Sequence, residues 1–170
     1  MHPRVKRAWK ELMIIISEIS EDDTSKTMFE KIKQWYQQNQ KFFLLSLIVK
    51  NQIDRLVNID NLELYPIEYS ECTPESIKSL LYTDPKSEDS VLSLVESQLW
   101  EIVVLITDDQ CQVCDSLGMF AIYDLKAEKV VLECSVCGAI QTIEGEAHDF
   151  QFPMTWRLAQ NKDLKAAGLI

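Results

Sequence analysis

Four of the five cysteines in this chain fall into two pairs with the same internal spacing. Cys111 and Cys114 form the first pair, Cys134 and Cys137 form the second, and nineteen residues separate the pairs. Two thiolates separated by two residues can turn toward one metal ion, and a second such pair completes a tetrahedron at about 2.3 Å per zinc–sulfur bond. Because this spacing is typical of four-thiolate zinc sites, we expect the four cysteines to bind one structural Zn²⁺.

The residues around the cysteine pairs predict the hairpin that would bring them together. Residues 119–123 and 129–133 have the composition of short strands, and residues 124–128 have that of the turn between them. Gly138 directly follows the second pair, where the chain must turn sharply and where glycine tolerates a positive φ. Residues 139–143 predict a further strand.

With these features the segment resembles the zinc-ribbon family. In that family the second metal-binding turn, or knuckle, typically reads Cys-x-x-Cys-Gly and is followed by a strand. The resemblance covers roughly residues 103–146, which is under a third of the chain. It implies a metal site, but zinc ribbons serve many unrelated tasks, so it implies little about function.

Other uses of the cysteines are less consistent with the sequence. Disulfides need an oxidising compartment, and nothing in the sequence indicates export. A redox-active Cys-x-x-Cys needs only one pair in a thioredoxin-like βαβ setting, which this segment lacks. Iron remains the alternative metal, because a tetrahedral four-sulfur site suits either ion. The fifth cysteine, Cys72, stands alone and is expected to be a small, partly buried residue.

Composition indicates a globular protein of one ordinary domain or a small pair. Of the 170 residues, 46% are hydrophobic and 26% are charged, which is enough to form a core. The N-terminal residues lack the apolar run of a signal peptide. The most apolar stretch, residues 42–49, lies between Lys41 and Lys50 and is far shorter than the ~20 residues of a membrane span. We therefore expect a cytoplasmic protein with no membrane partner.

Acidic residues are concentrated in the cysteine-rich part of the chain. The formal net charge is −10, and residues 100–150 hold 10 acidic but only 2 basic residues. Such a surface repels phosphate backbones, which supply most of the non-specific affinity for nucleic acids. The sequence therefore predicts no nucleic-acid partner and favours a basic protein partner.

The first hundred residues predict mainly helices. Apolar residues recur at helical spacing over residues 4–20, and again in a second helix from Met28 to Tyr36. The apolar positions of residues 42–57 favour a third, largely buried helix, with a strand at 42–49 as the alternative. Residues 58–71 are expected to form an ordered loop. Thr73 and Pro74 open a short helix, and residues 91–99 carry another.

From residue 102 the pattern changes to strands. Residues 102–107 are β-branched and predict a strand, residues 150–156 an extended return, and residues 157–169 a short docked helix or a frayed tail. The predicted fold class is α+β, with an N-terminal helical bundle packed against a C-terminal zinc-ribbon β-hairpin unit. The expected domains are residues 1–99 for the bundle, 100–150 for the ribbon and 151–170 for a docked tail.

No catalytic set is evident, so we do not expect an enzyme. The only histidines, His2 and His148, are expected to be solvent-exposed, and a shell of four cysteines leaves no open position on the metal. Two functions remain: an immunity or antitoxin protein that neutralises a basic, nuclease-type toxin, and a zinc-ribbon adaptor in transcription or RNA handling. The first is favoured by the charge. The proposed partner contacts are the carboxylates of the ribbon: Glu144, Glu146 and Asp149 above all, with Asp108, Asp109, Asp115 and Glu133.

Overall fold

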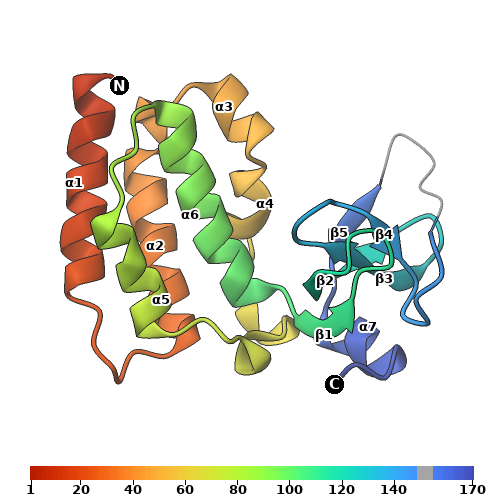
Figure 1. The fold of residues 1–170 in the computed structure, drawn as a ribbon. Coiled ribbons are helices and arrows are strands. Elements are labelled where there is room, and N and C mark those ends of the chain that lie inside the picture. The colour runs from red at the N-terminus through yellow and green to blue at the C-terminus, as the bar shows by residue number, and fades with distance from the viewer. Residues whose placement is uncertain (149–154) are drawn as a thin grey trace. The chain divides into compact units, whose positions relative to one another are not determined.

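The computed structural model describes residues 1–148 and 155–170 and combines N-terminal helices with a C-terminal antiparallel sheet (Figure 1). The chain forms two compact units. The first unit contains Met1–Asp60 and Glu71–Ile102, and the second contains Asn61–Ser70 and Val103–Ile170. The mixture of helices and sheet predicted from the sequence is confirmed.

Four helices make up most of the first unit: α1 (Pro3–Ser17), α2 (Ser25–Asn39), α5 (Pro74–Lys78) and α6 (Glu88–Val103). The apolar stripes predicted for the first two helices are buried, and the indole Nε1 of Trp35 donates to the carbonyl oxygen of Ala8 at 2.8 Å. Thr73 caps α5 as predicted, because its hydroxyl accepts from the backbone N–H of Ser76. Short 3₁₀ turns lie in both units: η1 (Gln40–Phe42) and η4 (Ser79–Tyr82) in the first, and η2 (Leu62–Leu64) and η3 (Ile67–Tyr69) in the second.

The single buried helix predicted over residues 42–57 is wrong, and so is the alternative strand. This stretch forms two short helices, α3 (Leu45–Lys50) and α4 (Ile53–Val57). Gln52 between them has a φ of 50°, in the left-handed region that interrupts a right-handed helix. The interruption changes the inward face, so Leu45 and Val49 are 73% and 66% exposed instead of buried.

The strand predicted over residues 102–107 begins later than expected. Ile102 and Val103 end α6, and the first strand starts at Ile106. Both residues are fully buried, and Ile102 continues the helical spacing of Val95 and Leu99, which are also fully buried. Burial on the helix therefore overrides the β-branched preference of these residues.

The second unit is built on an antiparallel sheet. Its strands are β1 (Ile106–Gln110), β2 (Leu117–Asp124), β3 (Lys129–Cys134), β4 (Ile140–Gln141) and β5 (Trp156–Leu158). The sheet order is β1-β2-β3-β4, and β5 also pairs with β2. The predicted hairpin is confirmed, with Met119 opposite Cys134 and Asp124 opposite Lys129. The strand predicted over residues 139–143 is shorter than expected, because the chain turns between Thr142 and Glu146.

The end of the chain adds a strand and a helix to this unit. Residues 157 and 158, predicted as part of a helix or tail, belong to β5, and α7 follows at Asn161–Ala166. The extended return predicted for residues 150–156 lies largely outside the described residues. Leu164 of α7 is fully buried in the same cluster as Met119 and Leu132 of the hairpin, so this helix closes one face of the sheet. Within the part of the chain that the structure describes, no helix has the length and apolar character needed to cross a membrane.

Candidate metal centre

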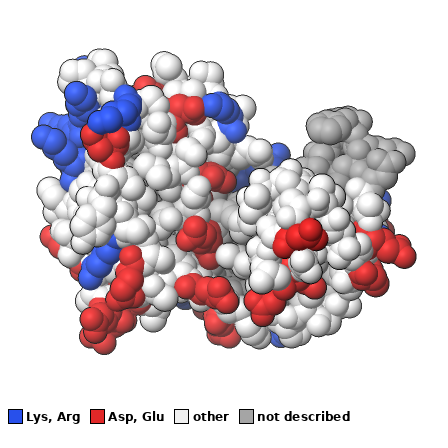
Figure 2. Space-filling model, in the orientation of Figure 1, with Lys and Arg blue, Asp and Glu red and all other residues white. Residues whose placement is uncertain are grey.

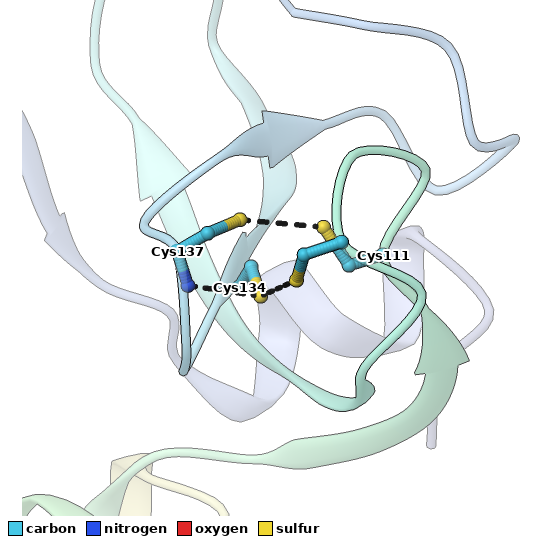
Figure 3. A group of neighbouring side chains, drawn as sticks. Cys111, Cys134 and Cys137 are labelled. Atoms are coloured by element: carbon cyan, nitrogen blue, oxygen red, sulfur yellow. Dashed lines mark hydrogen bonds between the residues drawn. The ribbon is translucent and has the colours of Figure 1, made fainter.

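The four paired cysteines meet at one end of the hairpin. Cys111 follows β1, Cys134 ends β3, and all four Sγ atoms lie within 4.8 Å of one another. Sγ of Cys111 is 3.6 Å from Sγ of Cys137, and the Cys114–Cys134 distance is also 3.6 Å. Figure 3 shows Cys111 approaching Cys134 and Cys137 from a separate loop. A tetrahedron with 2.3 Å metal–sulfur bonds has an edge of about 3.8 Å, so the cluster can hold one metal ion.

The geometry favours metal ligation over disulfide formation. A disulfide needs an S–S distance of about 2.05 Å, and all the cysteines are free thiols. Cys111 and Cys134 are buried in the core of the second unit, whereas Cys114 and Cys137 are exposed. Four sulfurs close a tetrahedral shell, and this arrangement suits a structural ion rather than a catalytic one.

The two knuckles, residues 111–116 and 134–139, share most of their backbone hydrogen bonds. In the first, the N–H of Cys111 donates to the carbonyl of Ser116 at 2.9 Å; in the second, the N–H of Cys134 donates to the carbonyl of Ala139 at 2.8 Å. The valine two residues after each leading cysteine donates its N–H to the sulfur of that cysteine, at 3.4 Å in both knuckles. This repeat makes Cys114 equivalent to Cys137, and Ser116 equivalent to Ala139.

Each knuckle turns through a residue with positive φ. Asp115 has a φ of 59° and Gly138 a φ of 69°, at equivalent positions directly after the second cysteine. The turn predicted at Gly138 is therefore confirmed, and the first knuckle makes the same turn with an aspartate. Aspartate tolerates this region better than most residues, because its short polar side chain can form local hydrogen bonds.

Side-chain hydrogen bonds distinguish the two knuckles. The Ser116 hydroxyl lies 3.0 Å from Sγ of Cys114 and 3.1 Å from Sγ of Cys134. At the equivalent position of the second knuckle, Ala139 has no hydroxyl. The first knuckle thus contributes a hydroxyl to the cluster, through one sulfur of each pair.

The hydrogen bonds separate the acidities of the thiols. Burial raises the pKa of Cys134. Hydrogen bonds from Ser116 and from the backbone N–H groups of Cys137 and Val136 outweigh burial and lower the pKa to about 5. The backbone N–H of Ala139 lowers the pKa of Cys137, but desolvation and the three neighbouring sulfurs together raise it to about 12. A bound metal ion would displace the protons of all four thiols.

Gln141 connects the first knuckle to β4. Its side chain is buried, its amide nitrogen donates to the carbonyl of Gln110 at 3.1 Å, and its amide oxygen accepts from the N–H of Gln112 at 3.1 Å. These bonds hold the chain on both sides of Cys111. Ser116 and Gln141 were missed by the sequence analysis. Aligning the two knuckles would have identified Ser116, but no sequence pattern indicates Gln141.

The carboxylates proposed as partner contacts lie on different parts of the second unit. Glu144 and Glu146 are exposed on the turn after β4. Asp108 is exposed and Asp109 half-buried on β1, which β2 and β3 separate from β4 in the sheet order. Asp149 lies outside the described residues. The remaining two, Asp115 and Glu133, lie in the first knuckle and on β3; burial raises the pKa of Glu133.

Glu144 also lines a cavity of about 480 Å³ in the second unit. The Thr142 hydroxyl lowers the pKa of this carboxyl group, and Lys129 lowers it further. Lys129 and Lys162 line the same cavity, so the surface beside Glu144 carries both charges. Asp163, another lining residue, is paired with Arg157 through two bonds of 2.6 and 2.9 Å.

His148 is not solvent-exposed as predicted, although His2 is. The His148 side chain is 13% exposed, and its Nε2 lies 2.9 Å from the Asp124 carboxylate. The same carboxylate accepts from the N–H groups of Lys126 and Ala127 in the hairpin turn. Asp124 therefore ties the hairpin turn to the segment after β4, a long-range contact that local sequence does not reveal.

Comparison of the chain with protein-family models, with curated proteins and with solved structures finds no match in any of the three.

Proposed function

We propose that Cys111, Cys114, Cys134 and Cys137 bind one structural Zn²⁺ and that the second unit is a zinc ribbon. The supporting observation is the pair of equivalent knuckles, which together present four sulfurs at tetrahedral spacing. Iron could bind in the same geometry. Elemental analysis of the purified protein is expected to find about one zinc per chain, whereas a red protein would indicate iron.

We further propose that the protein is not an enzyme and acts by binding a basic protein, as an immunity or antitoxin protein would. The observation that carries this proposal is the charge of the second unit, whose residues include twelve acidic and five basic side chains. Figure 2 shows more Asp and Glu than Lys and Arg on the visible face of this unit. Complementary charge accelerates association with a basic partner and repels nucleic acid.

The predicted contact surface is the turn that carries Glu144 and Glu146. Both side chains are exposed, and the turn is held by the Thr142 hydroxyl, which accepts from the N–H groups of both glutamates at 3.3 Å. A held turn presents the two carboxylates without a large loss of conformational entropy on binding. In a ribbon with this charge, these glutamates are the residues we expect to face the partner.

The test uses the proteins encoded by genes adjacent to this one. Each is co-expressed with the chain, and growth rescue and association rate are measured. The double substitution Glu144→Lys and Glu146→Lys should slow association, and the slowing should diminish as salt increases, because the Debye length is about 8 Å at physiological ionic strength. The matched control, Glu21→Lys with Asp22→Lys, changes the net charge equally at two exposed positions of the first unit.

Three results would contradict this proposal. They are the absence of rescue from any adjacent toxic gene product, unchanged association of the double variant, and equal slowing by the control. Binding of nucleic acid at physiological salt would instead favour the adaptor function.

A further inference from the structure

Two of the four metal ligands are open to solvent, and they occupy equivalent positions. Cys114 and Cys137 are both exposed, whereas Cys111 and Cys134 are buried. Since the two knuckles share most of their backbone hydrogen bonds, Cys114 and Cys137 differ mainly in the side chains that follow them. A reagent that attacks a sulfur of this centre from solvent must choose between these two.

The hydroxyl of Ser116 makes the two exposed sulfurs chemically different. A metal-bound cysteine is a thiolate without an S–H, so a hydroxyl in contact with it must be the donor. Ser116 lies 3.0 Å from Sγ of Cys114 and 3.1 Å from Sγ of Cys134, so its one proton is shared between these two sulfurs, and the hydrogen bond disperses negative charge from Cys114 as well as from the buried Cys134. A sulfur with less negative charge is a weaker nucleophile. The equivalent residue for Cys137 is Ala139, which has no hydroxyl to donate.

The residues that follow the two exposed cysteines also differ. Asp115 follows Cys114 and carries a carboxylate, whereas Gly138 follows Cys137 and has no side chain. A Cβ atom built at Gly138 would meet no atom within 4 Å, so the space around Gly138 is open. The Ser116 hydrogen bond therefore favours reaction at Cys137, and no side chain at position 138 opposes it.

We propose that Cys137 is a modification site, the sulfur at which soft electrophiles react first with the metal-loaded protein. The proposal rests on zinc binding by the four cysteines. With a haloacetamide, a sulfur lone pair forms the S–C bond and the halide leaves with the electron pair of the broken carbon–halogen bond. The product is a neutral thioether, a weaker zinc ligand than a thiolate. Modification of Cys137 should therefore release the metal and destabilise the ribbon.

The experiment treats the full-length, zinc-loaded chain with less than one equivalent of iodoacetamide. Zinc content is measured first, adducts are mapped by mass spectrometry, and released zinc is followed with a chromogenic chelator. The expected result is that Cys137 is modified about tenfold faster than Cys114, a factor equal to the lower end of the effect that loss of an outer-shell hydrogen bond has on metal affinity. Zinc release should follow the Cys137 adduct.

Exchange of the two knuckle side chains gives matched variants. Ala139→Ser should lower the rate at which Cys137 is modified, and Ser116→Ala should raise the rate at which Cys114 is modified. Ser17→Ala is the control, because the Ser17 hydroxyl donates to the carbonyl of Ile14 at 2.7 Å in the first unit, outside both knuckles. It should leave both rates unchanged.

The possible failures are distinguishable. A chain that binds no metal overturns zinc binding and this inference together. Normal zinc content with equal labelling of the two cysteines, or with Cys114 labelled first, overturns only the modification site. If Ser116→Ala does not retain zinc, the wild type still shows which of the two cysteines reacts first, and Ala139→Ser still shows whether a hydroxyl slows the reaction of Cys137.

Discussion

Removal of the metal should unfold the second unit and leave the first unit folded. Two of the four candidate ligands, Cys111 and Cys134, are themselves part of the buried core of the second unit. Ala121 and Ala159 belong to the same cluster, so cysteine and alanine make up four of its nine buried residues. The paired cysteines all lie in the second unit, and only Cys72 lies in the first.

The magnitude follows from the size of this unit. It contains about 78 residues, and a domain of that length has a free energy of unfolding of about 4–12 kcal/mol. Structural zinc in small domains contributes about 10–16 kcal/mol of binding free energy, which is folding free energy when the site is absent from the unfolded chain. Because the metal contribution exceeds the expected stability over most of these two ranges, the metal-free unit is predicted to be unfolded.

Amide hydrogen exchange after chelation is the appropriate assay, because it reports on each element separately. Treatment with a strong zinc chelator should abolish the protection of β2 and β3 and preserve that of α1 and α2. Cys134→Ser should reproduce the effect. Cys72→Ser is the control, because this buried thiol is outside the cluster, and its loss should leave one zinc per chain. Unchanged protection of β2 and β3 in the metal-free protein would contradict this prediction.

Three further predictions concern single residues. Gly138→Ala should lower the free energy of unfolding of the zinc-loaded protein by about 1–2 kcal/mol in thermal unfolding, because an L-residue is strained at a φ of 69°. The comparison variant is Gly168→Ala, at a φ of 72° and distant in sequence from the cysteines, which should leave zinc affinity unchanged. Thr73→Ala should lower the free energy of unfolding by about 1 kcal/mol in denaturant unfolding, because the α5 cap is lost. Thr73→Ser should retain the cap and the stability. Burial raises the pKa of Asp124, but hydrogen bonds from His148 and two backbone N–H groups lower it below its usual value. The stability that Asp124 contributes is therefore present above about pH 4 and lost as the pH falls through its lowered pKa. Asp124→Asn should be less stable than the wild type at pH 7, and the difference in stability should shrink below about pH 4.

The parts of the structure that the sequence predicted well depend on local spacing. The helices α1 and α2 follow from apolar residues that recur at the helical period, and their buried faces are the predicted ones. Residues 42–57 show where this reasoning stops, because the left-handed Gln52 carries no sequence signal strong enough to divide the helix. Residues 102 and 103 show the second limit, since β-branched residues extend a helix when its face is buried.

The four cysteines as candidate metal ligands and the hairpin between them could be predicted from the sequence, because ligand spacing is a property of the covalent chain and a tight turn satisfies it locally. The groups around the sulfurs and the long-range hydrogen bonds of the second unit depend on the tertiary structure. The contact of Ser116 with Cys134 spans 18 residues, that of Gln141 with Gln110 spans 31, and that of His148 with Asp124 spans 24. Each contact depends on the register of the sheet. A shift of one residue in that register would turn the side chains of a strand to the opposite face and remove these bonds.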